Sequence, residues 1–411
     1  MLKGKETLVK NLFMLYMLQF ANYIFPLITF PYLTRVLGPE KYGVVTYVYA
    51  VIIYLQIIVD FGFMLSATKD VVEYREDKNK LGEILGTVII LKLILAFICL
   101  ILVSIITFNI GLLRSNIAFT YLSFVVVVLS ILLPDYLFIG LEQMSILTIR
   151  FVLSKTVTIL LVFVLIRTSD DILYIPILNI LGTLIAVGLT WHEIIKKLQI
   201  RVIFNNINDC FVALKESSVY FISSVATTAF GALNTIVIGI YLPPTQVAYW
   251  GISYVLISTA QSLYTPLTTS FYPYMIANKD FGFIKRIIIS FMIPIVMATA
   301  VTFVYAEPII KLLCGLEYIE AIPVFRALTP VLVFSFPVMM IGFPLLGAMG
   351  KVKETSLSTV YSSVFHVGGL FFLIIFNRLN IINVAILRSL TEFIFLIIRL
   401  FWVLKYKNSK V

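Results

Sequence analysis

Long, uninterrupted apolar runs constrain this chain more than any other feature of its sequence. The stretch "LKLILAFICLILVSIITF" (91–108) contains a single charged residue, Lys92. Runs of this kind recur along the 411 residues, and 61% of the sequence is hydrophobic while only 13% is charged. A soluble domain carries about a quarter charged residues and could not bury so much apolar surface. The sequence therefore predicts a protein whose solvent is lipid.

The spanning elements are predicted to be helices. Only helices and closed barrels satisfy the backbone inside a bilayer, and barrel strands would alternate apolar and polar residues over about ten positions. The runs here are continuous, and a helical span needs about 20 apolar residues. This rule predicts twelve spans: 9–33, 42–64, 82–107, 117–138, 146–166, 173–194, 217–240, 247–275, 284–306, 323–347, 355–376 and 381–404.

A short polar turn between two apolar runs occurs twice. The stretches "PYLTRVLGPEKYGVVTY" (31–47) and "IVIGIYLPPTQVAYWGISY" (236–254) align at an offset of 205 residues, which places Pro39 on Pro244. Since this offset is half the chain, we predict two six-helix halves, 1–200 and 201–411. Chance likeness between two proline-containing turns is the alternative. Repeats of this kind enclose a cavity, so the predicted fold is an all-α integral membrane protein with about twelve spans in two six-helix bundles around a central cavity.

Lysine and arginine are unevenly distributed between the two predicted sides. With the N-terminus inside, 20 of them fall in the predicted cytoplasmic segments and 6 on the opposite side. Cytoplasmic loops are enriched in these residues, so both termini are predicted to be cytoplasmic. The first apolar run is too long for a cleavable signal peptide. The net charge of +10 follows from this topology, because the basic residues are spread over many loops rather than gathered for nucleic acid.

Ionisable residues deep inside the predicted spans are candidates for function, because they are costly in lipid. Lys92 and Lys155 have no acidic partner nearby in the sequence. We predict that both line a cavity that accepts an anionic cargo. Arg388 is a third deep cation and a further candidate for this cavity. It lies four residues before Glu392, so the alternative is that the two side chains neutralise each other on one helix face.

A second set of charged residues lies near the ends of predicted spans. Asp60, Asp135, Arg150 and Arg399 are close enough to a span end for their side chains to reach the interface. Interface placement is therefore the simpler interpretation for all four. For Asp60 and Asp135, a role in proton or ion coupling is the alternative.

Polar residues within spans complete the candidate set. Asn22 and Asn234 occupy corresponding spans of the two halves and are predicted to line the cavity. His366 is in the middle of a span, where it is either a proton carrier or a hydrogen-bonded packing residue. Glu392 is a second candidate for proton or ion coupling.

Several function classes find no support in the sequence. It contains no nucleotide-binding loop, no HExxH zinc motif and no paired cysteines, and it has only two histidines and three cysteines. The DFG at 60–62 lacks the other motifs of a kinase. We therefore predict no enzyme activity, no cofactor and no metal.

The N-terminal third of the chain resembles a known transporter family. The stretches "RVLGPEKYG" (35–43), "DFG" (60–62), "SATKD" (66–70) and "GLEQM" (140–144) are similar to motifs of the Wzx-type polysaccharide biosynthesis and O-antigen flippases. That family belongs to the superfamily that also contains multidrug-and-toxin extruders and lipid II flippases. The likeness is strong over residues 10–150 and looser afterwards.

The resemblance implies a flippase of the bacterial cytoplasmic membrane with a fold like that of the multidrug-and-toxin (MATE) extruders. Its cargo would be an undecaprenyl-pyrophosphate-linked oligosaccharide, moved outward by alternating access for O-antigen, capsule or exopolysaccharide assembly. Lys92 and Lys155 would accept the pyrophosphate. Expected partners are this cargo, membrane lipid, and the polysaccharide polymerase and chain-length machinery, but not nucleic acid. The alternatives are a multidrug or cation antiporter, which needs an acidic cavity, and a membrane polysaccharide polymerase, which needs larger outer loops.

Overall fold

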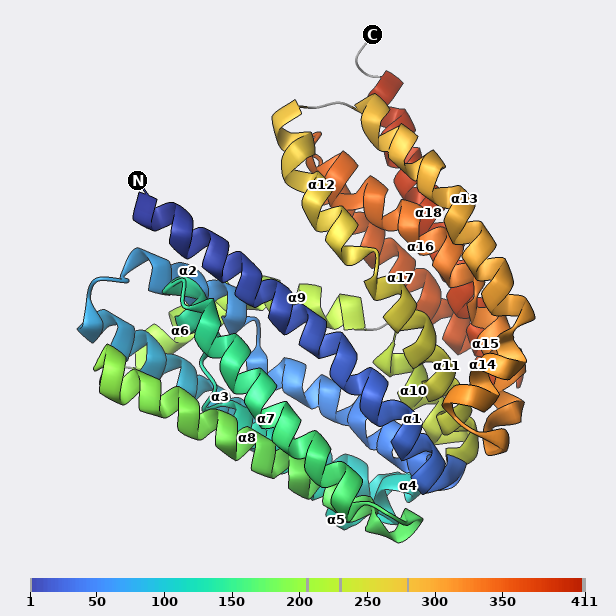
Figure 1. Ribbon diagram of the computed structural model, residues 1–411, viewed down its shortest axis with the longest axis horizontal. Coiled ribbons are helices and arrows are strands. Elements are labelled where there is room, and N and C mark those ends of the chain that lie inside the picture. The colour runs from blue at the N-terminus through green and yellow to red at the C-terminus, as the bar shows by residue number, and fades with distance from the viewer. Residues whose placement is uncertain (1, 205–206, 229–230, 279–280, 409–411) are drawn as a thin grey trace. The chain divides into compact units, whose positions relative to one another are not determined.

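The computed structural model describes residues 2–204, 207–228, 231–278 and 281–408. Within these ranges the regular elements are helices and no strand occurs (Figure 1). The all-α prediction is therefore confirmed. The chain divides into two compact units, Met1–Val225 and Ala226–Val411, which we call the first and the second unit. The division into repeated halves at 200/201 stays a prediction.

The helices have the length and the exposed apolar surface of membrane spans. In the described part of the chain, nine segments are long and apolar enough to cross a membrane. One of them, Phe13–Glu73, covers most of the predicted span 9–33 and all of 42–64. The predicted spans 217–240 and 247–275 are each divided into two shorter helices. The predicted twelve spans are compatible with this pattern. In Lys78–Asn109 only 33% of the apolar window is buried, so most of these side chains need lipid around them.

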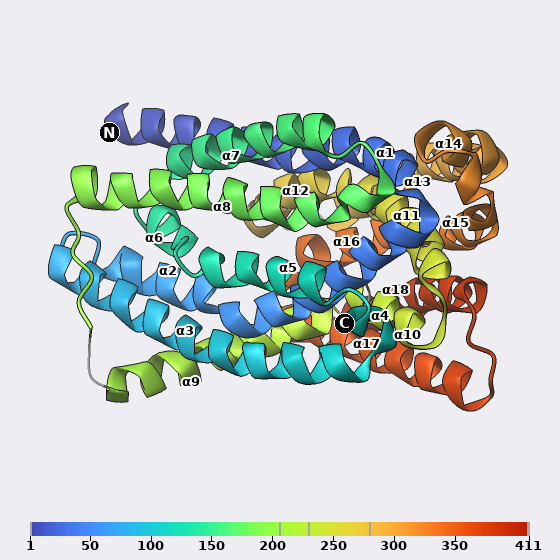
Figure 2. The same ribbon diagram turned by 90° about the horizontal axis from the view of Figure 1, so that it is seen from below.

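The first unit is a bundle in which α7 packs against α1 and α8, and α5 packs against α8 (Figure 2). Its elements in chain order are α1 (Leu2–Asp60), α2 (Phe63–Glu73), α3 (Lys78–Asn109), α4 (Gly111–Arg114), α5 (Ile117–Ser130), α6 (Asp135–Gly140), α7 (Met144–Leu165), η1 (Ser169–Leu173), α8 (Tyr174–His192), η2 (Glu193–Leu198) and most of α9 (Ile207–Thr228).

The long element α1 consists of two helices that meet at Gly38. This residue has φ 65° and ψ 173°, a backbone conformation that glycine adopts without a steric cost. Pro39 follows it, at a helix start where the missing N–H costs nothing. At the corresponding place, α11 begins at Pro244 with Pro243 as its N-cap, shortly after α10 (Ala232–Tyr241) ends. Both predicted turns are therefore present.

The DFG segment holds α9 within the first unit. Gly62 has φ 80°, and a Cβ atom on it would lie 2.7 Å from the carbonyl oxygen of Ser217. The Ser66 and Ser217 hydroxyls are 2.7 Å apart, and the ring of Phe61 stacks on that of Phe221 at 4.5 Å. Glycine at position 62 therefore allows both the turn and the close approach of α9.

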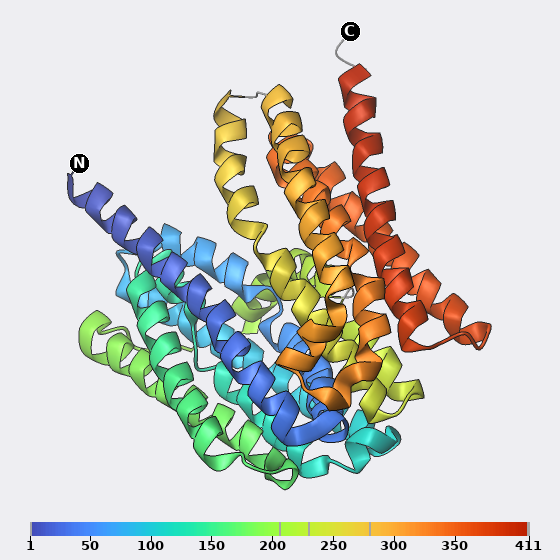
Figure 3. The ribbon, with the colours of Figure 1, turned by 45° about the vertical axis from the view of Figure 1, so that its right-hand side comes forward.

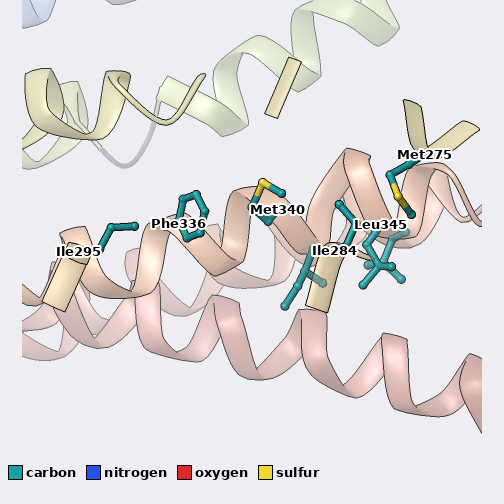
Figure 4. Packing of buried hydrophobic residues seen from close by; sticks show 8 residues of the cluster. Met275, Ile284, Ile295, Phe336, Met340 and Leu345 are labelled. Atoms are coloured by element: carbon teal, nitrogen blue, oxygen red, sulfur yellow. The ribbon is translucent and has the colours of Figure 1, made fainter. Parts of the chain in front are cut away.

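The second unit packs around a buried cluster that includes Met275, Phe336 and Met340 (Figure 4). Helix α17 lies against α18, the red C-terminal helix of Figure 3. The elements after α10 are α11 (Pro244–Ser262), α12 (Thr265–Asn278), α13 (Phe281–Val304), α14 (Ala306–Leu313), η3 (Leu316–Ala321), α15 (Ile322–Leu328), α16 (Pro330–Met340), η4 (Ile341–Gly347), α17 (Val352–Ile375) and α18 (Ile381–Asn408).

Candidate functional site

The first unit contains a cavity of about 600 Å³ between α1, α5, α6, α7 and α8, which we call the main cavity. Its size is that of a small-molecule site. Apolar side chains form much of its wall, and the polar lining residues are Asn22, Asp135, Arg150, Ser154, Lys155, Thr158, Asn179 and Thr183. The cavity therefore combines an apolar wall with a few polar and charged groups.

Lys155 is the cation without an acidic partner among the described residues that line this cavity. It projects from the middle of α7 and lines both the 600 Å³ cavity and an adjoining one of about 350 Å³. Among the described residues, no side chain or carbonyl forms a hydrogen bond or an ion pair with it. An ammonium group in apolar surroundings gains strongly from any anion that enters. Its position in the middle of a helix agrees with the depth expected from the sequence, and its role in accepting an anionic cargo stays a prediction.

The adjoining cavity adds neutral hydrogen-bonding groups. Asn22 and Asn179 line both cavities, and Tyr49 lines the smaller one. The Asn179 side-chain amide donates to the Tyr49 hydroxyl at 2.8 Å. Asn22 is exposed at the cavity surface, as expected for a cavity-lining residue. Sequence reasoning missed Asn179 and Tyr49, because neutral polar residues in a span give little signal.

Lys92 has a partner that the sequence pattern does not reveal. Its ammonium lies 2.6 Å from the Asp60 carboxylate, which also accepts from the Gln56 amide at 2.8 Å. The pair lines a third cavity of about 310 Å³, which shares Asp135 with the 600 Å³ cavity. Of the two lysines expected to be unpaired, only Lys155 therefore lacks an acidic partner among the described residues that line these cavities.

Arg150 and Asp135 form a second ion pair in the wall of the main cavity. The Arg150 guanidinium donates to the Asp135 carboxylate, and to the Thr190 hydroxyl at 2.9 Å. These contacts join α6, α7 and α8. Only 7% of the Arg150 side chain is exposed, so it does not extend to the interface as expected. A signal was available: an acid and a base lie on successive predicted spans.

Arg399 also departs from the interface placement expected for it. It is buried and donates to the Val338 carbonyl, and to the Ser358 hydroxyl at 3.1 Å. A Cβ atom on Gly342 would lie 2.5 Å from its guanidinium. The backbone at Gly342 is non-helical, and Arg399 satisfies a carbonyl beside this break. Its role is therefore structural.

Arg388 and Glu392 pair within the second unit. Their side chains are 2.6 Å apart on one face of α18, and both are buried. This confirms the interpretation that the two residues neutralise each other. Neither lines the cavities of the first unit.

His366 and Asn234 belong to a buried hydrogen-bonded group of the second unit. One ring nitrogen of His366 lies 2.8 Å from the Asn234 side-chain oxygen, and the other lies 2.8 Å from the Thr391 hydroxyl. The three residues join α10, α17 and α18. All three are fully buried. This geometry matches the packing interpretation of His366, and its role as a proton carrier stays a prediction.

Replacing His366 with leucine is expected to destabilise the second unit. The change removes the two hydrogen bonds that join the imidazole to Asn234 and Thr391 in a fully buried site, and each lost hydrogen bond costs about 0.5–1.5 kcal/mol. The apparent melting temperature of the purified protein in detergent should therefore fall by several degrees. His192→Leu is the matched control, because His192 is exposed. An unchanged melting temperature for His366→Leu would show that the hydrogen bonds contribute nothing to stability.

Comparison with known sequences places the chain in a family. The sequence pattern of the family described as "Polysaccharide biosynthesis protein" matches residues 8–279. A protein of Escherichia coli (strain K12) named "Putative O-antigen transporter" is 28% identical over 291 residues, which are 70% of this chain and 69% of the relative.

Comparison with solved structures supports the fold. The lipid II flippase MurJ in an inward closed conformation has a TM-score of 0.72 and 17% identity, covering 93% of this chain and 86% of the other. An inward-facing multidrug resistance MATE family transporter of the MOP superfamily has a TM-score of 0.69 and 13% identity, covering 94% of this chain and 98% of the other. At these identities the likeness shows a shared fold, and this confirms the predicted fold class.

Proposed function

The chain belongs to the polysaccharide biosynthesis protein family, and from this premise we propose that it is a flippase for a lipid-linked oligosaccharide. The cargo carries phosphate and is moved from the cytoplasmic to the outer face of the bacterial cytoplasmic membrane. The names of the similar E. coli protein and of MurJ support this class of cargo. We further propose undecaprenyl pyrophosphate as the lipid carrier, both termini in the cytoplasm, and alternating access of two six-helix halves.

The observation that carries the proposal is the unpaired ammonium of Lys155 in the main cavity. A cation exporter would need a free acidic group there, whereas both acidic residues of these cavities already hold a cation, Lys92 or Arg150. A phosphate oxygen at Lys155 would form a charge-assisted hydrogen bond. Asn22, Asn179 and Tyr49 supply further donors and acceptors for phosphate or sugar hydroxyls.

The lipid tail need not enter the cavity. Only the headgroup is incompatible with the bilayer core, since a polar group there is costly unless it is hydrogen-bonded. We propose that the first unit shields the headgroup while the tail remains in lipid. An enzymatic step is not part of this function. Partnership with a polymerase and with chain-length machinery is a proposal that follows from the pathway.

Ion coupling at Glu392, His366, Asp60 or Asp135 stays a prediction. Each of these side chains is hydrogen-bonded or ion-paired in the structure. Coupling at any of them would therefore require an exchange of partners. The membrane potential is an alternative source of energy, since moving one charge across 100 mV is worth about 2.3 kcal/mol.

Complementation tests the proposed function. Expression in a bacterial strain that lacks its own flippase, and that assembles a defined undecaprenyl-pyrophosphate-linked glycan, is expected to restore surface glycan. An empty vector and a strain that retains its flippase set the limits of the assay. Failure across several glycan backgrounds, together with export of small organic cations, would instead favour the antiporter alternative.

A further inference from the structure

The Asp60–Lys92 and Asp135–Arg150 ion pairs, which line cavities of the first unit, share an asymmetry. All four residues line the cavities, but in each pair the carboxylate is much more exposed than the cation. The Asp60 side chain is 41% exposed and that of Lys92 is 8% exposed. The Asp135 side chain is 34% exposed and that of Arg150 is 7% exposed. Asp135 also lines both cavities, so the two pairs border one connected polar region.

The energetic consequences of this asymmetry differ for the two partners. A buried cation that loses its partner is strongly destabilised, so Lys92 and Arg150 need an anion at all times. A carboxylate that is already exposed can turn away and be hydrated in the cavity at little cost. The phosphate oxygen of a headgroup is an equally suitable acceptor for an ammonium or a guanidinium.

We infer that Asp60 and Asp135 are exchangeable counter-anions, a conclusion that rests on the proposed function. The anionic headgroup displaces these carboxylates from Lys92 and Arg150, and the carboxylates return when the headgroup leaves. In the absence of cargo, the carboxylates thereby keep Lys92 and Arg150 from being unpaired cations beside Lys155. The displaced carboxylates also repel the bound phosphate, which keeps its affinity low enough for release.

Binding of undecaprenyl pyrophosphate to the purified full-length protein in lipid nanodiscs tests this inference. Asp135→Asn removes the competing charge and is expected to lower the Kd roughly fivefold, the effect of one nearby charge in a partly hydrated site. Dissociation should slow to a similar extent. Asp170→Asn is the matched control, because Asp170 is an exposed acid of the same unit outside the described cavities. It should leave the Kd unchanged.

A double variant distinguishes exchange of anions at Arg150 from a general effect of removing one negative charge. Asp135→Asn combined with Arg150→Gln removes both partners and should return the Kd to the wild-type value or above it. An unchanged or weaker affinity in Asp135→Asn alone would overturn the inference while leaving the proposed function in place. If wild type binds neutral undecaprenol as well as the pyrophosphate, the proposed function fails as well.

Folding is the remaining concern, because Asp135→Asn leaves Arg150 without its carboxylate. If this variant does not give a monodisperse protein, Asp60→Asn carries the same expectation through Lys92. If both variants misfold without cargo, undecaprenyl pyrophosphate added during purification should restore a monodisperse protein, because its phosphate supplies the missing anion. Failure of the added lipid to do so would overturn the inference.

Discussion

Lys155→Met is expected to lose transport while keeping or gaining stability. The ammonium has no hydrogen-bond or ion-pair partner among the described residues, so its charge adds no such bond to the fold and bears the cost of desolvation. Methionine fills similar volume without a charge. In the proposed mechanism the lost contact is a charge-assisted hydrogen bond worth about 1.5–3 kcal/mol, which corresponds to a loss of roughly tenfold to a hundredfold in cargo handling.

The amount of surface glycan in the complemented strain measures transport, and thermal unfolding of the purified protein measures stability. Lys155→Arg should retain part of the activity, because it keeps the charge. Lys80→Met is the control, since Lys80 is an exposed lysine of the same unit. A Lys155→Met protein with full transport would show that this lysine does not contact the cargo. One that unfolds at a much lower temperature would show that it is a structural residue.

Gly82→Ala is expected to produce the largest loss of stability in the first unit. The segment that follows η2 lies directly on α3: the Ile203 amide donates to the Gly82 carbonyl at 3.0 Å. A Cβ atom on Gly82 would lie 2.1 Å from the Arg201 carbonyl oxygen, and one on Gly86 would lie 2.1 Å from that of Ile203. The obstacle is backbone rather than a flexible side chain. Overpacking of this kind costs about 1–3 kcal/mol and occasionally more.

Gly188→Ala is the matched control for this change. Gly188 is also a helical glycine, on α8, and a Cβ atom there would meet nothing within 4 Å. Alanine should therefore be neutral or stabilising at that position, because it is the better helix former. Gly82→Ala should lower the melting temperature in detergent and reduce the yield of folded protein. Equal melting temperatures for the two variants would mean that the segment 199–204 separates from α3 without cost.

The fold could be predicted well because every residue of a membrane span needs a satisfied backbone and a side chain that is compatible with lipid. The apolar runs fixed the helical class, and Pro39 and Pro244 marked turns that the structure places at those positions. The lengths of individual helices were harder to predict. The division of the predicted span 247–275 into α11 and α12 was not marked in the hydropathy of the sequence.

The candidate site could be predicted only in part. Depth in the span identified Lys155, and the spacing of four residues identified the Arg388–Glu392 pair. The partner of Lys92 could not be predicted, since Asp60 is 32 residues away and is brought close only by the packing of α1 on α3. Arg150 was placed at the interface because position along a span says nothing about a partner on a neighbouring helix.

Transport by the purified protein tests the central claim most directly. The protein would be reconstituted into liposomes that contain a fluorescent undecaprenyl-pyrophosphate-linked oligosaccharide, and the fraction accessible to a membrane-impermeant quencher would be followed over time. We predict that wild-type protein equilibrates this lipid between the leaflets far faster than protein-free liposomes do, and that Lys155→Met does not. A wild-type rate equal to that of protein-free liposomes would contradict the account.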